Sequence, residues 1–301
     1  DLTVDYACPT MSEFTVLSNE NGVCKIKIND ECLYDIKKND LIWHGEVGKN
    51  GKHYWSDSYI SNKRHIKLLK PDTKLFMDFS RKDIEFEAIE DMGNNILRVT
   101  LKNKDVYFPA GSVIQTRNIV RDQTGALFQR CKNLHFENVR IKFMHGLGMV
   151  SQFCENVTYK NCDFTPADNR TSASTADFFQ FSGCKGQLTI DSVKAWGAHD
   201  DYVNVHGTHL RVIKRNKRKN TITVRFMHHE SWGFQAFEIG DELEFIKWDT
   251  LIPYDKTKVL SYKRLNDTDV CLYLDRKVPE TLELGKDVVE NATWTPDLTV
   301  K

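Results

Sequence analysis

The sequence has no long apolar run. None of its 301 residues lies in a stretch close to the roughly 20 apolar residues that a membrane-spanning helix requires. Lys plus Arg and Asp plus Glu number 42 each, so no net charge favours nucleic acid or an anionic membrane. No segment has the pattern of an amphipathic helix or of a secretory signal. These absences predict an all-β protein with no nucleic-acid partner and no membrane span.

The eight cysteines lack the arrangement of a disulfide framework or of a metal site. There is no C-x-x-C pair and no Cys/His group at metal-ligand spacing. His228 and His229 are adjacent, whereas paired zinc ligands are usually separated by several residues. We therefore predict no metal and no cofactor. The pairing of four cysteines stays open: Cys8, Cys24, Cys32 and Cys271.

What the chain does contain is an internal repeat. The segment 131–139, C-K-N-L-H-F-E-N-V, returns at 154–162 and in a looser copy at 184–193. Such a period with short alternating strands is typical of a solenoid, in which each unit stacks on the next. Residues that recur at one period should then form ladders. The sequence predicts a ladder of interior cysteines and two ladders of turn asparagines. The members are Cys131, Cys154 and Cys184; Asn133 and Asn156; Asn138 and Asn161.

Two regions interrupt the repeat. Residues 9–125 and 208–292 contain alternating strands separated by turn signals. We interpret them as two parts of one β-barrel or sandwich that packs beside a parallel β-helix formed by 126–207. Residues 1–8 and 293–301 each look like one coil strand. We therefore expect an internal piece of a longer protein, with coils missing on both sides.

Three aspartates fall at the repeat interval. Asp200 follows Asp177 at the same interval that separates Cys131 from Cys154, and Asp201 comes directly after it. Because neighbouring parallel strands lie about 4.8 Å apart, stacking should bring Asp177 within one strand spacing of the pair. The segment 148–152 takes the comparable place one coil earlier and has no acid. The polar loop 166–175 precedes Asp177 and is expected to overhang the cluster.

Grouped carboxylates suit hydrolysis of glycosidic bonds, in which one donates a proton and another activates water or attacks the sugar. Mutual repulsion should raise the pKa of at least one member. The alternative is that Asp200 and Asp201 belong to a solvated turn. Asp177 at one period, followed after the pair by Asn204 and His206, favours catalysis.

The segments 177–184, D-F-F-Q-F-S-G-C, and 197–207, G-A-H-D-D-Y-V-N-V-H-G, resemble glycoside hydrolase family 110, the α-galactosidases that remove terminal α-1,3-linked galactose. The likeness continues at 5–9, 43–46, 226–237 and 240–242. The resemblance implies a right-handed parallel β-helix with an associated β-barrel. It also implies inversion without a metal, and Asp177, Asp200 and Asp201 as the catalytic residues.

The resemblance leads us to expect a galactose-terminated oligosaccharide or glycoconjugate as substrate and a secreted or periplasmic bacterial location. A homodimer is a further expectation. Five more residues are candidates for binding the glycan. They are Gln180 and Asn204, which could instead form a ladder, His206 beside the exit to the barrel, and Trp196 and Trp232 as stacking faces.

The mechanism is less determined by the residues themselves. Inverting carboxyl pairs lie about 6.5–9.5 Å apart and retaining pairs about 5–5.5 Å apart. Consecutive strand residues point to opposite faces, so Asp200 and Asp201 share a site only if the chain bends near 197–199. Asp177 is favoured as the acid. Two alternatives remain: a polygalacturonase-like hydrolase on the same fold, or a non-catalytic glycan-binding solenoid.

Overall fold

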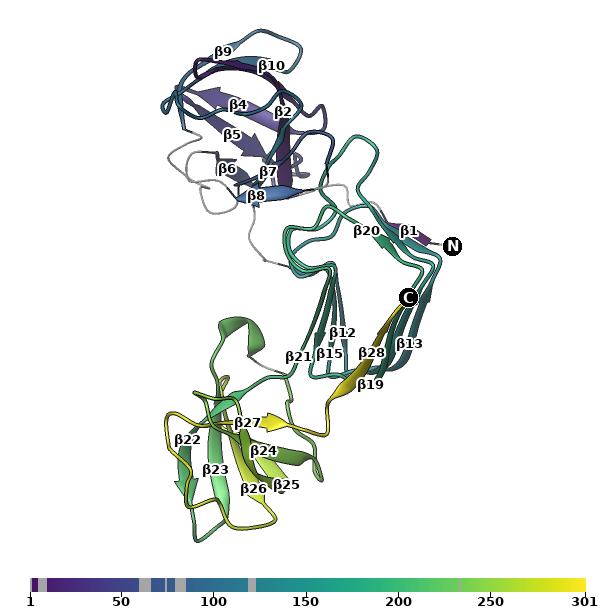
Figure 1. Cartoon of the computed structure of the whole chain (residues 1–301), viewed down its shortest axis with the longest axis vertical. Coiled ribbons are helices and arrows are strands. Elements are labelled where there is room, and N and C mark those ends of the chain that lie inside the picture. Colours follow the sequence, from purple (N-terminus) through teal and green to yellow (C-terminus); the bar gives the residue numbers. More distant parts are fainter. Residues whose placement is uncertain are drawn as a thin grey trace.

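The computed structural model describes residues 2–4, 10–59, 66–73, 75–78, 85–118, 123–232 and 234–301. Cys8 and the segment 5–9, which contributed to the resemblance, lie outside the described residues. A stack of parallel coils forms the middle of the molecule, with one β module on each side (Figure 1). The described part contains one short 3-10 helix, η1 (His229–Ser231), and no helix suited to crossing a membrane.

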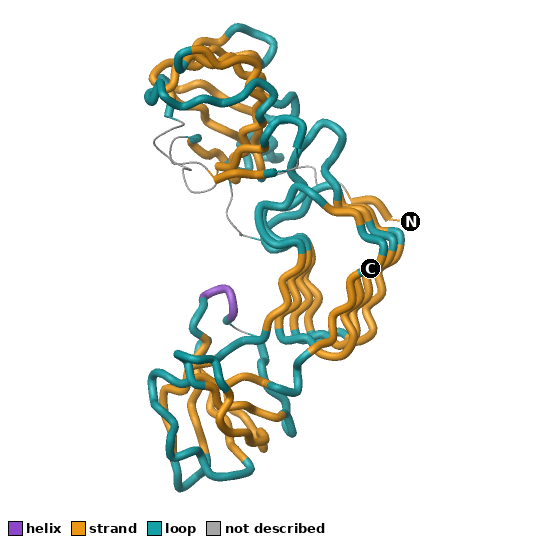
Figure 2. The backbone as a smooth tube through the Cα atoms, in the orientation of Figure 1, coloured by secondary structure: helices purple, strands orange, loops and turns teal. Residues whose placement is uncertain are grey.

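The coils contribute strands to three parallel sheets, which run as stacked rungs along the central body (Figure 2). The first sheet contains β12 (Ala126–Gln129), β15 (Met149–Gln152), β18 (Phe179–Ser182) and β21 (Val203–His206). The second contains β13 (Lys132–Glu137), β16 (Glu155–Lys160), β19 (Lys185–Asp191) and β28 (Pro296–Val300). The third contains β1 (Leu2–Val4), β14 (Val139–Ile141), β17 (Asp163–Phe164) and β20 (Lys194–Ala195). The predicted all-β fold with a parallel β-helix is confirmed.

The expected ladders hold the coils in register. Cys154 and Cys184 are buried inside the helix, and Cys131 of the same column is partly exposed. At one corner the Asn156 side-chain amide donates a 2.9 Å hydrogen bond to Asn133 Oδ1. Both asparagines have left-handed backbone conformations, which this residue type tolerates better than most. Asn156 therefore belongs to a turn ladder, as expected.

The first module has its own sheets and its own core. Its larger sheet has the order β8-β7-β11-β2-β3-β10-β9, and a smaller one has the order β4-β5-β6. The strands are β2 (Met11–Glu20), β3 (Val23–Ile28), β4 (Leu33–Lys37), β5 (Asp40–His44), β6 (Ser56–Ser58), β7 (Ile66–Leu69), β8 (Phe76–Asp78), β9 (Phe86–Asp91), β10 (Ile96–Leu101) and β11 (Val113–Arg117). Trp43, Tyr59 and Phe86 are the largest side chains of its core.

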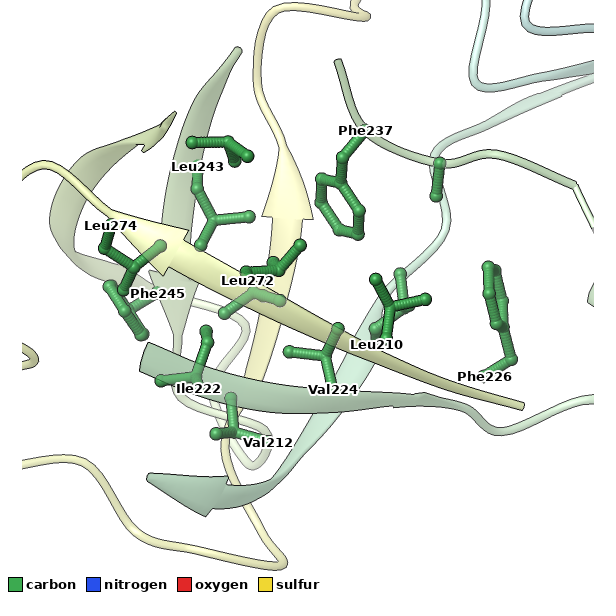
Figure 3. Close-up of a cluster of buried hydrophobic side chains, with 14 of the residues drawn as sticks. Leu210, Val212, Ile222, Val224, Phe226, Phe237, Leu243, Phe245, Leu272 and Leu274 are labelled. Carbon is green, nitrogen blue, oxygen red and sulfur yellow. The ribbon is translucent and has the colours of Figure 1, made fainter. Parts of the chain in front are cut away.

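The second module is a closed six-stranded barrel with the order β22-β23-β26-β25-β24-β27. Its strands are β22 (Leu210–Asn216), β23 (Thr221–Phe226), β24 (Glu242–Ile246), β25 (Pro253–Arg264), β26 (Asp269–Leu274) and β27 (Val288–Asn291). Figure 3 shows Leu210, Val224, Phe237 and Leu272 among the apolar side chains that fill it.

The barrel differs from the sequence-based interpretation, in which both interruptions contribute to one barrel. All six of its strands come from the second interruption. The two modules have separate cores and lie on opposite sides of the coils (Figure 1). Closure pairs both edges of each strand within the module, so no edge is left for strands of the first module to join.

The corner at Gly186 gives a test of the register. Its φ of +71° is left-handed, and a Cβ there would lie 2.3 Å from Asn156 Oδ1. Gly183, in the same coil, has φ +58°, but a Cβ there would meet only Phe153 at 3.4 Å. We expect Gly183→Ala to lower the free energy of unfolding by about 1 kcal/mol through backbone strain alone. Gly186→Ala should cost roughly 1–3 kcal/mol more because it also displaces the ladder. Urea denaturation of both variants measures the difference, and equal losses would contradict the ladder.

Candidate active site

The three aspartates meet at one end of the first coil sheet. Phe179 of β18 pairs with Val203 of β21, so Asp177 and Asp201 both lie two residues before the paired positions. One carboxylate oxygen from each of Asp177, Asp200 and Asp201 lies within 4.8 Å of the others. Asp177 is only 3% exposed, whereas Asp200 and Asp201 are exposed to solvent. The structure thus assembles a cluster with one buried and two accessible carboxyl groups.

A bend before the pair lets two consecutive residues share this site. Strand β21 begins only at Val203, and the preceding chain makes one isolated bridge, between Ala198 and Ser174. Gly197 has φ +86°, a conformation that favours glycine. Residues 199–202 therefore do not follow the strict alternation of a strand. The bend that the sequence required at 197–199 is present.

One expected alignment is off by one position. Met149 pairs with Phe179, and Val150 pairs with Gln180. Aligning Gly148 with Asp177 would instead have paired Met149 with Phe178. The loop inserted before Asp177 is therefore one residue longer than the alignment of Gly148 with Asp177 implies.

The last part of the loop before Asp177 is buried, whereas we expected a polar loop that overhangs the cluster. Residues 173–176 are fully buried, and Ser174 Oγ donates a 2.7 Å hydrogen bond to the Asp177 carbonyl. Farther back, Thr171 Oγ1 donates to Glu13 Oε2 at 2.6 Å. The Arg170 and Glu13 side chains, 5% and 3% exposed, form a 3.8 Å ion pair. The polar residues of the loop thus bind the first module, which composition alone could not indicate.

The outer face of β18 and β21 carries three of the predicted binding residues. Gln180 and Asn204 are paired neighbours, and the Gln180 amide lies 3.5 Å from His206 Nε2. Gln180 and His206 also line a pocket of about 340 Å³. Its opposite wall comes from the barrel module and includes Met227, His228 and Ser231. A polar strip therefore leads from the acids toward the barrel.

His209 is a pocket residue that the sequence did not single out. Its Nε2 lies 3.2 Å from Glu290 Oε2, and this hydrogen bond raises the pKa of His209 above its ordinary value. Glu290 belongs to β27, so its proximity depends on barrel closure. The sequence offered one sign of this residue, the H-G-T-H run at 206–209, where the chain leaves the coils for the barrel.

The two predicted tryptophans do not belong to the strands that carry this strip. Trp196 follows β20, a strand of the third coil sheet, and is partly buried. Trp232 directly follows η1 on the barrel module and is 50% exposed. Their stacking on a sugar stays a prediction.

The same three carboxylates could also hold a cation. Oxygen ligands bind Ca²⁺ at about 2.3–2.6 Å, so two ligands of one ion can be separated by up to about 5 Å. The oxygens within 4.8 Å meet this condition. Proton transfer and cation binding thus both fit the geometry.

Comparison with known proteins identifies the relatives of this chain. Residues 221–289 match the family model described as GLAA-B beta-barrel domain II. The chain is 37% identical over 299 residues to alpha-1,3-galactosidase A of Akkermansia muciniphila, covering 99% of this chain and 48% of that relative. The chain is a homologue of the α-1,3-galactosidases. It spans about half the length of the curated relatives it matches.

Two further relatives support the homology over the whole chain. Alpha-1,3-galactosidase A of Bacteroides fragilis is 33% identical over 306 residues, covering 100% of this chain and 48% of the relative. The protein of the same name from Bacteroides thetaiotaomicron is 31% identical over 303 residues, covering 100% and 51%. These relatives confirm the family resemblance that the sequence motifs indicated.

A chelator distinguishes proton transfer from cation chemistry. If the acids act without a metal, incubation of the intact protein with excess EDTA followed by dialysis should leave the galactosidase activity proposed below within about twofold of the untreated rate. Loss of activity that Ca²⁺ or Mg²⁺ restores would contradict this expectation and assign the three oxygens to a cation. Asp191→Asn, on β19 and outside the cluster, should respond to EDTA like the unmodified protein.

Proposed function

We propose that this chain forms part of an exo-acting, inverting α-galactosidase that releases terminal α-1,3-linked galactose from oligosaccharides or glycoconjugates. Asp177, Asp200 and Asp201 are its proposed catalytic residues. The observation that carries the proposal is the meeting of three carboxylate oxygens within 4.8 Å in a homologue of α-1,3-galactosidases. Because such glycans lie outside the bacterial cytoplasm, a secreted or periplasmic location is part of the proposal.

The exposure of the acids supports a division of roles. A water that donates to two carboxylate oxygens lies about 2.8 Å from each, which separates those oxygens by about 4.5 Å. The 4.8 Å limit suits one water held between Asp200 and Asp201, both of which solvent reaches. Asp177 then donates the proton to the leaving oxygen. The support for inversion comes from the family resemblance. The distances do not add to it, because the nearest oxygens of the three acids lie within 4.8 Å, whereas inverting carboxyl pairs are about 6.5–9.5 Å apart.

The position of the cluster supports action at a chain end. The first module contacts the residue before Asp200, because the Lys67 ammonium donates to the His199 carbonyl at 2.5 Å. A bound glycan can continue in the other direction, along Gln180, Asn204 and His206 toward the barrel pocket. Asp201 and His206 are five positions apart, which corresponds to about 16 Å of extended chain. This strip is where we place the sugars that precede the terminal galactose.

Proton NMR of the reaction tests the activity and its stereochemistry together. With an α-1,3-galactobiose or a blood-group-B-type oligosaccharide, the intact protein should release β-galactose first. Asp177→Asn and Asp201→Asn should each lower kcat by on the order of 10²–10⁴-fold, while Asp191→Asn leaves it unchanged. Early α-galactose would overturn inversion. Absence of galactose from the intact protein would overturn the proposed activity.

The separate roles can be assigned with activated substrates. Asp177→Asn should keep most of its rate on an aryl α-galactoside whose leaving group needs no proton, because only the acid is missing. Asp201→Ala should stay slow on that substrate and recover with azide, which replaces the activated water and yields β-galactosyl azide. The reverse pattern would exchange the roles of the two residues.

A further inference from the structure

Both acid-bearing turns are held by one strand of the first module. Strand β11 reaches the first turn through Arg117, whose guanidinium donates to the carbonyl of Thr175, two residues before Asp177. It reaches the second turn through Gln115, whose Oε1 accepts a 2.6 Å hydrogen bond from His199 Nε2. His199 directly precedes Asp200.

Gln115 also joins the two turns to each other. Its amide Nε2 donates a 2.7 Å hydrogen bond to Thr171 Oγ1 in the loop that leads to Asp177. The carbonyl oxygen and the amide nitrogen of one side chain thus bind two segments from successive coils, at Thr171 and at His199. A single displacement of Gln115 would therefore affect both turns.

This contact is buried and rigidly supported. Gln115 is 0% exposed and His199 is 5% exposed. In the larger sheet of the first module, β11 lies between β7 and β2, so its backbone is hydrogen-bonded on both sides. From the neighbouring strands, Lys67 binds the His199 carbonyl and the Phe76 ring lies 5.7 Å from the His199 ring. Residue 199 is fixed at both its backbone and its side chain.

The coils hold these turns without regular strand pairing. Around them the described pairing consists of isolated bridges, Met144 with Ser174 and Ser174 with Ala198, and of single backbone hydrogen bonds such as the one from the Phe178 amide to the Asp201 carbonyl at 3.1 Å. Regular pairing resumes only at Phe179 and Val203, beyond the acids. Like charges at this separation also repel one another, which favours opening of the turns unless another element holds them. Because a misplacement of about 1 Å can cost roughly 10²-fold in rate, holding them affects function directly.

We propose that the first module positions the acid cluster, with Gln115 and Arg117 as positioning residues that act through His199 and Thr175. The inference rests on the proposed galactosidase function for its kinetic consequence, but its structural consequence is independent of substrate. The module thus serves the active site without contributing one of its reacting groups.

The test compares Gln115→Met with Thr116→Val in the intact protein. Methionine keeps the length of glutamine but loses both hydrogen bonds, and Thr116 is an equally buried neighbour on β11. Gln115→Met should lower kcat at least tenfold with KM within about twofold, and Thr116→Val should keep both. Arg117→Met should resemble Gln115→Met. Unchanged kcat in Gln115→Met would overturn the proposal.

Variants of His199, alone and combined with Gln115→Met, distinguish a positioning role from a general loss of structure. His199→Gln can still donate to Gln115 and should keep most of kcat, whereas His199→Leu should lower kcat, though by less than Gln115→Met, which also loses the bond to Thr171. The double variant Gln115→Met/His199→Leu should be no slower than Gln115→Met, because that substitution already removes the bond to His199. Additive losses would mean that the two residues act independently and would contradict the proposal.

Hydrogen–deuterium exchange provides the readout without substrate. In Gln115→Met, peptides covering 174–178 and 197–202 should exchange faster, while barrel peptides from 221–274 keep their protection. Thr116→Val should leave all of them unchanged. Faster exchange everywhere would indicate destabilisation and overturn positioning. If the unmodified protein releases no galactose, the proposed function fails, and these exchange rates still decide whether the module holds the turns.

Discussion

The in-register stacking of parallel strands is the constraint on which the rest of the structure depends. Each coil hydrogen-bonds to the next through three sheets, so residues one coil apart lie side by side. The interior fixes this register with buried side chains such as Tyr159 and Phe179, and the corners fix it with the Asn133–Asn156 bond. A slip of one residue would turn every interior side chain outward. The same register brings Asp177 level with Asp201, so the proposed chemistry depends on the packing of the core.

The two modules relate differently to this stack. The barrel is closed, and its core includes Phe153 from a corner of the coils, whose ring stacks on Trp294 with 3.7 Å between the ring centroids. The first module also has its own core, but buried polar contacts connect it to the coils, among them Glu13 with Arg170 and Gln115 with His199. Buried polar groups of this kind require a fully formed set of partners. Such contacts therefore fix one orientation of the first module on the coils, whereas a purely apolar contact would allow several orientations.

The proposed active site separates two tasks. The coils place carboxylates at one strand spacing, and the neighbouring module restrains the turns that carry them. Placing the acids where regular strands end allows Asp200 and Asp201 to approach one site, which strict alternation would prevent. The consequence is a local chain without regular strand pairing, which we propose the first module restrains. The loop 166–175 connects the coils to the first module through Arg170 and Thr171.

The sequence by itself determined the features that depend on spacing and alternation. The period of the cysteines and asparagines predicted the coils, their ladders and the meeting of Asp177 with Asp200 and Asp201, because stacking converts a constant interval into contact. Only the tertiary structure decided that the barrel closes from the second interruption alone, that the loop is buried, and that Gln115 touches His199. Those contacts join segments as far apart as 158 residues, as between Glu13 and Thr171, with no shared period to relate them. They arise from how separately folded bodies fit together, and no local pattern of polar and apolar residues encodes that fit.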